Sequence, residues 1–234
     1  MRTPAKERAM MMLEDLIAQN PALFKKEYNH FYRRGSYLLH QGEPLQSLFF
    51  ILKGSGIVGC VDEDGGERVL HYFHRGDCAG KAALYRERGN SPIFEGASIV
   101  AMTDCLCYKV PLEECVNYAQ QHAGVFRYLM EVLGREVGRL EENLMLMREN
   151  KTAAVLCRFF QDNAYDQKGV LALDRWFNYE ELSRILGIHS VTISRMVRRL
   201  MEEGVVAREP HRFLILQPAA LESYAAGKQP LHYL

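Results

Sequence analysis

The segment from Asn178 to Leu200 restricts the possible fold most, because it predicts two short helices packed across a tight turn. Asn178 can cap the first helix, and Glu181, three residues later, can reach back to complete a capping box. Gly187 stands at the turn, where glycine tolerates the backbone that a sharp reversal requires. The interior positions that would lock the two helices together are Leu182, Leu186, Ile188, Ile193 and Met196. This layout is that of a helix-turn-helix unit.

The outer face of the second predicted helix suits the major groove of DNA. From Arg184 to Arg199 there are four arginines and no acidic residue, although the formal net charge of the chain is zero. Arg195 is predicted to contact a base, because arginine can donate two hydrogen bonds to guanine. The predicted DNA-binding residues are Ser190, Val191, Thr192, Ser194, Arg195, Arg198 and Arg199. Of these, Thr192, Ser194, Arg198 and Arg199 suit phosphates, which position the protein rather than specify the sequence.

The alternative for this face is a solvated cationic surface on an ordinary small helical domain. Residues 205–207 and 213–216 lie on either side of Pro210 and predict a winged hairpin after the second helix. A wing beside a helix-turn-helix favours DNA binding over the alternative.

Residues 125–150 predict the longest helix, because they contain no proline. Apolar residues recur there with alternating spacings of four and three, the a/d seam of a coiled coil: Phe126, Met130, Leu133, Val137, Leu140, Leu144 and Met147. A partner helix is expected. The alternative is a helix packed only on its own domain, because Leu129, Val132 and Leu146 widen the apolar stripe. Gly134 and Gly138 weaken the helix and suggest that something approaches it closely.

The first half of the chain predicts one helix followed by a small antiparallel barrel or sandwich. Residues 6–19 have helical apolar spacing that ends at Asn20 and Pro21. Short apolar runs follow at residues 37–39, 48–52, 57–58, 69–73 and 99–101. Turn residues separate these runs, including Asp64 and Gly65 as a hairpin signal. At 234 residues, the chain is long enough to favour two domains.

Between Phe31 and Leu216 the chain resembles the Crp/Fnr family of bacterial transcriptional regulators. In the first half the resemblance rests on Gly35, Gly42, Glu43, the run from Leu48 to Gly54, Asp64, Gly65, Gly76 and Asp77. In the second half it rests on the helix-turn-helix. The segment from His189 to Arg195 is most similar to the recognition helix of the chlorophenol-sensing halorespiration regulators.

The resemblance implies an α+β fold with three parts. Residues 1–122 would form an effector-sensing β-roll like a cyclic-nucleotide-binding domain, with flanking helices. Residues 123–150 would form the coiled-coil dimerisation helix, and residues 151–234 the winged helix-turn-helix domain. The residues themselves predict a further apolar helix after Thr152, followed by a polar surface connection from Gln161 to Gly169.

The resemblance also implies a function. A homodimer would bind a pseudo-palindromic operator in double-stranded DNA, and an effector would reorient its DNA-binding domains. Surface loops such as residues 161–169 would contact RNA polymerase. Many relatives carry glutamate in the recognition helix where this chain has Val191. A base read by that glutamate would here be read by apolar contact, suited to a thymine methyl, or would not be read at all.

The effector is expected to differ from cyclic AMP. Members that bind cyclic AMP use a glutamate after a glycine, and later an arginine and serine, whereas this chain has Lys81 after Gly80 and Glu95 before Gly96. A carboxylate facing a phosphodiester would repel it. The resemblance instead points to a small organic effector, an aromatic or phenolic acid. The predicted effector-binding residues are Gly80, Lys81, Leu84, Tyr85, Tyr128, Arg135 and Arg139. The alternatives are a solvated Lys81, outer-face arginines and core tyrosines.

A redox- or haem-based sensor with the same DNA-binding output is the alternative function. The six cysteines are expected to be reduced, and most of them buried. No cysteine precedes Cys60, which argues against the iron–sulfur cluster of the oxygen-sensing branch. His71 and His74 lie near Cys78, where the carbon-monoxide-sensing branch places haem ligands. Cys105 and Cys107 would share a strand face, which permits a redox pair.

Other classes of protein fit the sequence less well. No phosphate-binding loop, nucleophile-elbow serine or spaced metal-ligand set occurs, so an enzyme is not expected. A kinase subunit or channel regulated by cyclic nucleotides would lack the helix-turn-helix. No stretch approaches the roughly 18 apolar residues of a membrane span, and no secretory signal is present, so the protein is expected in the cytoplasm.

Overall fold

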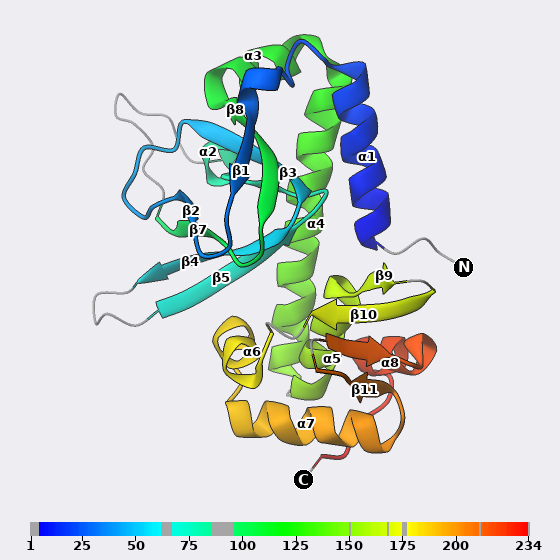
Figure 1. The fold of residues 1–234 in the computed structure, drawn as a ribbon. Helices are drawn as coiled ribbons and strands as arrows, with labels where there is room; N and C mark the ends of the chain where they lie inside the picture. The colour runs from blue at the N-terminus through cyan, green and yellow to red at the C-terminus, as the bar shows by residue number, and fades with distance from the viewer. Residues whose placement is uncertain are drawn as a thin grey trace. The chain divides into compact units, whose positions relative to one another are not determined.

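The computed structural model describes residues 5–61, 67–85, 96–149, 151–167, 169–174, 177–210 and 212–233. The chain forms two compact units, Met1–Glu136 and Val137–Leu234, which are described separately (Figure 1). Asp64, Gly65 and Glu95 lie outside the described residues, as do the side chains of Tyr85 and Met147. Among the described helices, none is both long enough and apolar enough to cross a membrane.

The N-terminal unit contains two four-stranded sheets in which every neighbouring pair of strands is antiparallel. One sheet has the order β1 (Asn29–Tyr32), β8 (Cys105–Pro111), β3 (Ser47–Lys53) and β6 (Cys78–Ala79). The other has the order β2 (Tyr37–Leu39), β7 (Ser98–Ala101), β4 (Ser55–Val61) and β5 (Glu67–His74). The predicted antiparallel β-domain is confirmed.

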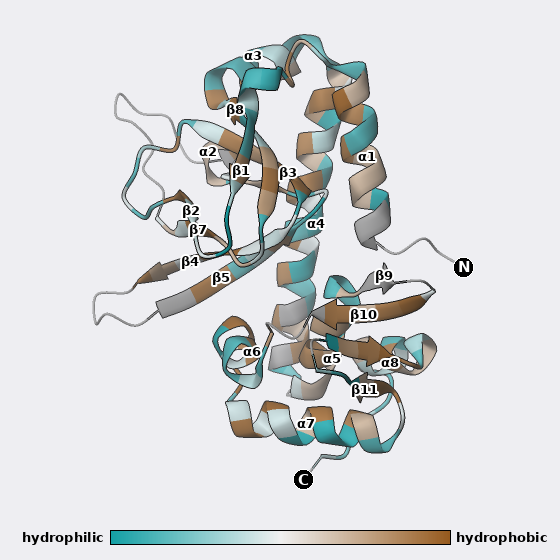
Figure 2. Cartoon of the chain, in the orientation of Figure 1, coloured by the Kyte–Doolittle hydropathy of each residue, from teal (hydrophilic) through white to brown (hydrophobic). Residues whose placement is uncertain are grey.

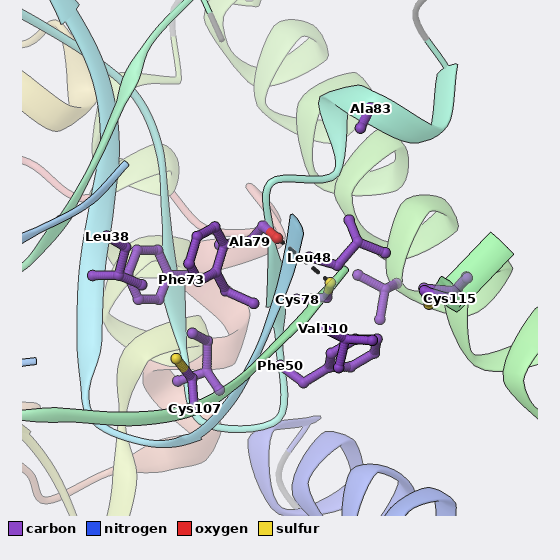
Figure 3. Close-up of a cluster of buried hydrophobic side chains, with 14 of the residues drawn as sticks. Leu38, Leu48, Phe50, Phe73, Cys78, Ala79, Ala83, Cys107, Val110 and Cys115 are labelled. Carbon is purple, nitrogen blue, oxygen red and sulfur yellow. Dashed lines mark hydrogen bonds between the residues drawn. The ribbon is translucent and has the colours of Figure 1, made fainter. Parts of the chain in front are cut away.

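The core of this unit explains why the strands read as apolar runs. In β3 four consecutive residues are buried, so this strand lacks the alternation of a half-exposed strand. Figure 3 shows Phe50, Phe73 and Val110 packed in this core. This core holds β3 in place, and the turn at Gly80 packs against β3.

The helices of this unit are α1 (Ala5–Gln19), the 3-10 helix η1 (Lys26–Tyr28), α2 (Ala82–Tyr85), α3 (Leu112–Gln121) and the first part of α4 (Ala123–Arg148). The predicted opening helix is confirmed as α1, which buries Ala9, Leu13 and Leu16. It ends where the Asn20 side chain donates a hydrogen bond to the Leu16 carbonyl at 2.7 Å. The predicted long helix is confirmed as α4.

The C-terminal unit begins within α4 and continues through α5 (Thr152–Asn163), β9 (Tyr165–Gln167), β10 (Val170–Asp174), α6 (Tyr179–Leu186), α7 (Ser190–Glu202), β11 (Val206–Arg208), β12 (Arg212–Ile215) and α8 (Pro218–Ala225). Its sheet has the order β11-β12-β10-β9. The predicted winged hairpin is confirmed, because β11 and β12 pair antiparallel with Val206 opposite Ile215. Figure 2 shows that β10 is predominantly apolar, as a central strand should be.

The prediction that Gln161 to Gly169 is a surface connection is wrong. The first residues of this stretch complete α5, and Tyr165–Gln167 form β9, which pairs with β10. The polar residues misled the prediction because β9 is a short strand at the sheet edge, where one side of the backbone has no neighbouring strand.

Candidate DNA-binding surface and effector site

The first helix of the helix-turn-helix is fixed by its cap and by the turn that follows it. The Asn178 side chain accepts hydrogen bonds from the backbone N–H groups of Glu180 and Glu181, each at 2.9 Å. The Glu181 carboxylate pairs with Arg184, so the reciprocal half of the predicted capping box is not formed. Gly187 ends α6 with φ 65°, a left-handed backbone that favours glycine.

The predicted interior of the motif is confirmed. All five residues predicted to lock the helices together are buried: Leu182, Leu186, Ile188, Ile193 and Met196. Val197 and Leu200 extend the same buried face of α7. Burial of one whole face fixes which side chains α7 can present on the other face.

The exposed face of α7 carries most of the predicted DNA-binding residues. Val191 is 53% exposed, an unusual setting for valine. Arg195 and Arg198 are also exposed, and within the described part of the chain neither is paired with an acid. The half-buried hydroxyl residues beside them are Ser190, Thr192 and Ser194. This face offers cations, hydroxyl groups and one apolar contact.

Arg199 has a different setting from the other predicted arginines. Its Nε atom lies 2.8 Å from Glu203 Oε1, and its Nη1 atom lies 3.5 Å from Glu202 Oε2. Glu203 also accepts a hydrogen bond from the Tyr224 hydroxyl. These carboxylates neutralise Arg199 and make it a weaker candidate for a phosphate contact than Arg198.

Two features of this surface were not predicted. His189 caps α7, because its Nδ1 atom accepts a hydrogen bond from the Val191 N–H at 3.3 Å. Arg208 on the wing lies over the Tyr179 ring, 5.9 Å from the centroid. Histidine is not among the commonest capping residues, and a contact between β11 and α6 depends on the tertiary fold, so local sequence patterns did not reveal either feature.

The predicted seam on α4 is largely exposed in the single chain. The exposed seam residues are Phe126, Met130, Val137, Leu140 and Leu144, and Leu133 is half-buried. By contrast, Leu129, Val132 and Leu146, which widen the stripe, are buried. A methyl group added to Gly134 or Gly138 would meet no described atom of this chain within 4 Å. The helix therefore has a covered flank and an uncovered apolar seam.

The predicted effector residues Gly80 and Lys81 lie between β6 and α2. Gly80 has φ 78°, and a Cβ there would lie 2.8 Å from the Ser47 carbonyl oxygen, so this turn is pinned against β3. The Lys81 side chain is only 6% exposed, and its ammonium group pairs with the carboxylate of Glu136 on α4. The alternative of a solvated Lys81 is therefore wrong.

The remaining predicted effector residues occupy several settings. Tyr128 is buried, and its hydroxyl donates a hydrogen bond to the Gly76 carbonyl at 3.2 Å. Burial raises the pKa of this phenol well above its ordinary value, as expected of a core tyrosine. Arg135 is half-buried, with Nη1 3.9 Å from Met12 Sδ, while Leu84 is half-buried on α2. Arg139 belongs to the C-terminal unit.

The cysteines have the environment of core residues. Five of the six are buried, and only Cys60 is half-buried. Desolvation raises the pKa of Cys105 to about 11 and that of Cys107 to about 12. Figure 3 shows Cys78, Cys107 and Cys115 among apolar side chains. Among the described residues, no group of three or more His, Cys, Asp or Glu side chains could hold a metal ion.

The histidines considered as haem ligands interact with acids. His71 Nε2 lies 3.3 Å from Glu136 Oε1, and His74 Nδ1 lies 3.4 Å from Asp77 Oδ2. A surface hollow of about 510 Å³ lies elsewhere, lined by Pro111, Glu113, Glu114, Asn117, Tyr118 and Gln121. None of the predicted effector residues lines this hollow.

Two family models match the chain. The cyclic nucleotide-binding domain model matches residues 29–122, and the Crp-like helix-turn-helix domain model matches residues 150–224. The cAMP-activated global transcriptional regulator CRP of Salmonella typhimurium is 25% identical over 185 residues, covering 76% of this chain and 84% of the relative. The transcriptional activator protein anr of Pseudomonas aeruginosa is 23% identical over 205 residues, covering 84% of this chain and 80% of the relative.

Solved structures have the same fold. FixK2 from Bradyrhizobium japonicum has a TM-score of 0.67 at 16% identity, over 84% of this chain and 96% of FixK2. OCPA-complexed CprK has a TM-score of 0.60 at 13% identity, over 88% of this chain and 93% of CprK. The named relatives are transcriptional regulators and not enzymes. The chain therefore belongs to the Crp family of transcriptional regulators, with a cyclic nucleotide-binding domain followed by a Crp-like DNA-binding domain.

Proposed function

We propose that this regulator acts as a homodimer that binds a pseudo-palindromic operator and responds to a small aromatic or phenolic acid rather than to cyclic AMP. The observation that carries the DNA-binding part is the exposed face of α7, where Arg195 and Arg198 have no acidic partner among the described residues and Val191 lies beside them. Arg195 reads a base, Arg198 binds phosphate, and Val191 contacts a thymine methyl.

The uncovered seam of α4 supports the homodimer. Five apolar side chains at heptad spacing are exposed in the single chain, while the flank of the same helix is buried. A second copy supplies a matching seam, because two identical helices with this repeat bury it against each other. The open space at Gly134 and Gly138 leaves room for the partner helix. The dimer would present two α7 helices about 34 Å apart, the spacing of successive major grooves.

Gly80 and Lys81, between β6 and α2, support an effector other than cyclic AMP. This holds although the first unit matches a cyclic nucleotide-binding domain and several relatives are named as cAMP-activated. Lys81 stands where the cyclic-AMP-binding pattern has glutamate, and its charge is already balanced by Glu136. Lysine cannot accept hydrogen bonds from ribose hydroxyls as a carboxylate can. The same cation favours a carboxylate or phenolate ligand.

A melting screen of the reduced, full-length protein tests the effector class. We expect aromatic carboxylates to raise the melting temperature, because a ligand at 100 times its Kd adds roughly 2.7 kcal/mol of stability. We expect cyclic AMP to produce no shift. A shift with cyclic AMP, confirmed by submillimolar binding in calorimetry, would contradict the proposal.

The setting of the thiols favours an organic effector over a redox sensor. Thiolates are the reactive form of cysteine, and burial raises the pKa of Cys107, Cys115 and Cys157 to about 12. Haem is disfavoured by the contacts that His71 and His74 make with acids. These observations leave the sensor alternative weaker than the organic acid.

RNA polymerase is the proposed protein partner. Residues 161–169 stay the candidate contact, although residues 161–163 end α5 and Tyr165–Gln167 form the edge strand β9. Gln161 and Gly169 are exposed. Substitutions at Gln161 should reduce transcription without reducing operator binding. Unchanged transcription would remove this segment as the contact.

A further inference from the structure

The ion pair of Lys81 and Glu136 joins the turn between β6 and α2 to the long helix α4 within the N-terminal unit. Only 6% of the Lys81 side chain and 17% of the Glu136 side chain are exposed. The second Glu136 oxygen lies 3.3 Å from His71 Nε2 on β5. One carboxylate on α4 thus interacts with two other parts of the unit.

The backbone at Lys81 is held in place, which favours separation of the pair by movement of Glu136. The Lys81 carbonyl accepts a hydrogen bond from the Leu84 N–H at 2.8 Å, within the turn that begins α2. The preceding residue, Gly80, is closely packed on the β3 backbone at Ser47. The ammonium group is therefore carried by a turn that is packed on β3, and its partner Glu136 projects from α4.

The buried ammonium group requires a compensating anion. Removing one member of a buried ion pair leaves an uncompensated charge, which is strongly unfavourable. Departure of Glu136 is therefore costly unless another anion replaces it. An aromatic carboxylate has the same charged group as Glu136 and is chemically able to take its place.

Glu136 also lies where a displacement would matter. It is the last residue of the N-terminal unit, and α4 continues from Val137 into the C-terminal unit. The flanking seam residues are Leu133 and Val137. The neighbouring Arg135 has a buried Nη2 atom with no hydrogen-bond partner among the described residues. Its guanidinium group is thus a second donor in the N-terminal unit, in addition to the Lys81 ammonium group.

We propose that Glu136 is an internal stand-in for the acidic group of the effector, and that an aromatic acid binds by displacing Glu136 from Lys81. The displaced carboxylate moves toward water and frees α4 at the boundary between the units. This inference rests on the proposed organic-acid effector and adds how that effector is coupled to the dimerisation helix.

Calorimetry on the full-length protein tests the exchange. The probes are benzoate, 4-hydroxybenzoate and 4-hydroxyphenylacetate, each with its uncharged amide. The variants are Glu136→Gln, which keeps the shape but removes the competing charge, and Glu141→Gln, an exposed acid on the same helix. We expect Glu136→Gln to tighten carboxylate binding by about tenfold or more, a common size for coupling between sites. The affinity of Glu136→Gln for the amides should equal that of the wild type. The affinity of Glu141→Gln for the carboxylates should also equal that of the wild type.

Three other outcomes are distinguishable. Carboxylate binding by Glu136→Gln alone supports the exchange, with Glu136 excluding the probe from the wild type. Carboxylate binding that Glu136→Gln does not tighten overturns the exchange but leaves the organic-acid proposal intact. No carboxylate binding by either protein overturns both, because a Lys81 without its competitor would then accept no aromatic acid.

Hydrogen exchange on the wild-type protein provides a second test that does not depend on the folding of a variant. A carboxylate probe that binds should speed exchange of the amides around Glu136, whereas its amide should not. Binding with slower or unchanged exchange in α4 would overturn the displacement of Glu136.

Discussion

Arg195 and Arg199 lie one helical turn apart on α7, yet their surroundings differ. Arg195 is exposed and has no acidic partner within the described residues, whereas Arg199 contacts Glu202 and Glu203. A guanidinium held by carboxylates must give up those contacts before it can bind DNA, whereas a free one need not. Spacing along the helix identified both arginines, but only the local contacts separate them.

Replacement of Arg195 should therefore relax base specificity. We expect Arg195→Ala to lose about 1–3 kcal/mol of discrimination at one base pair, the usual contribution of a two-hydrogen-bond contact to guanine. Arg199→Ala is the matched control and should leave the base preference unchanged. Binding to single-base operator variants measures both effects. Equal losses of discrimination in the two variants would contradict these roles.

The thiols are residues whose environment predicts slow chemistry. Burial raises the pKa of Cys105 to about 11 and of Cys115 and Cys157 to about 12. A raised pKa means less thiolate at pH 8 than in an exposed cysteine, and the thiolate is the form that reacts. In the native protein, Cys60 should thus be the first thiol to react with an alkylating reagent at pH 8, with the other five released by denaturant. Mass spectrometry of the labelled protein measures this order; rapid native labelling of the buried cysteines would instead favour the redox sensor.

At the scale of the element, α4 has two apolar surfaces with different exposure. Its flank, with Leu129 and Val132, belongs to the core of the N-terminal unit, whereas its seam is uncovered. The 3.6-residue period of a helix explains both, since positions one residue apart point about 100° away from each other. The sequence pattern therefore allowed both packing on the chain and pairing with a partner.

A charge on the seam should separate the dimer. Leu140 is 55% exposed on the seam, and Met145 is 57% exposed on α4 outside the seam, so they form a matched pair. We expect Leu140→Glu to raise the dimer dissociation constant by about tenfold or more, because an unpaired charge would be buried in the interface. Met145→Glu should remain dimeric. Sedimentation velocity measures both; an unchanged Leu140→Glu dimer would show that the seam is not the interface.

The elements also show how far the sequence could predict the structure. Strong local signals predicted α1, α4, the helix-turn-helix and the wing, because apolar period, caps and turn residues agree there. The strand β9 was missed because its residues are polar, and the Glu181 half of the capping box was wrong because Arg184 takes that carboxylate. The Lys81 and Glu136 pair joins residues far apart in the chain, so no local pattern could predict it.

At the scale of the whole molecule, the packing of the elements determines where the chain can be cut. A cut at Gly169 would separate β9 from β10 and remove α8, which packs on α5. A cut after Arg148 removes the DNA-binding elements and leaves α4 complete.

The fragment of residues 1–148 should therefore dimerise without binding DNA. The seam on α4 is complete in this fragment, whereas α7 and the wing are absent. Sedimentation and gel-shift measurements, with the full-length protein as the control, check the two parts separately. Specific DNA binding by the fragment would show that the DNA-binding surface has been assigned to the wrong part of the chain.

The most direct test of the proposed effector-responsive, dimeric DNA binding is selection of binding sites from random DNA. The full-length protein is used, with and without the aromatic carboxylates. We expect an inverted repeat bound by one dimer, with half-site centres about 10 base pairs apart, one turn of the double helix. We also expect a thymine at the base pair that Val191 faces. Enrichment of the repeat should differ between selections with and without an aromatic carboxylate. A single half-site bound by a monomer, or no enriched sequence in either condition, would contradict the proposed dimeric, sequence-specific binding to DNA.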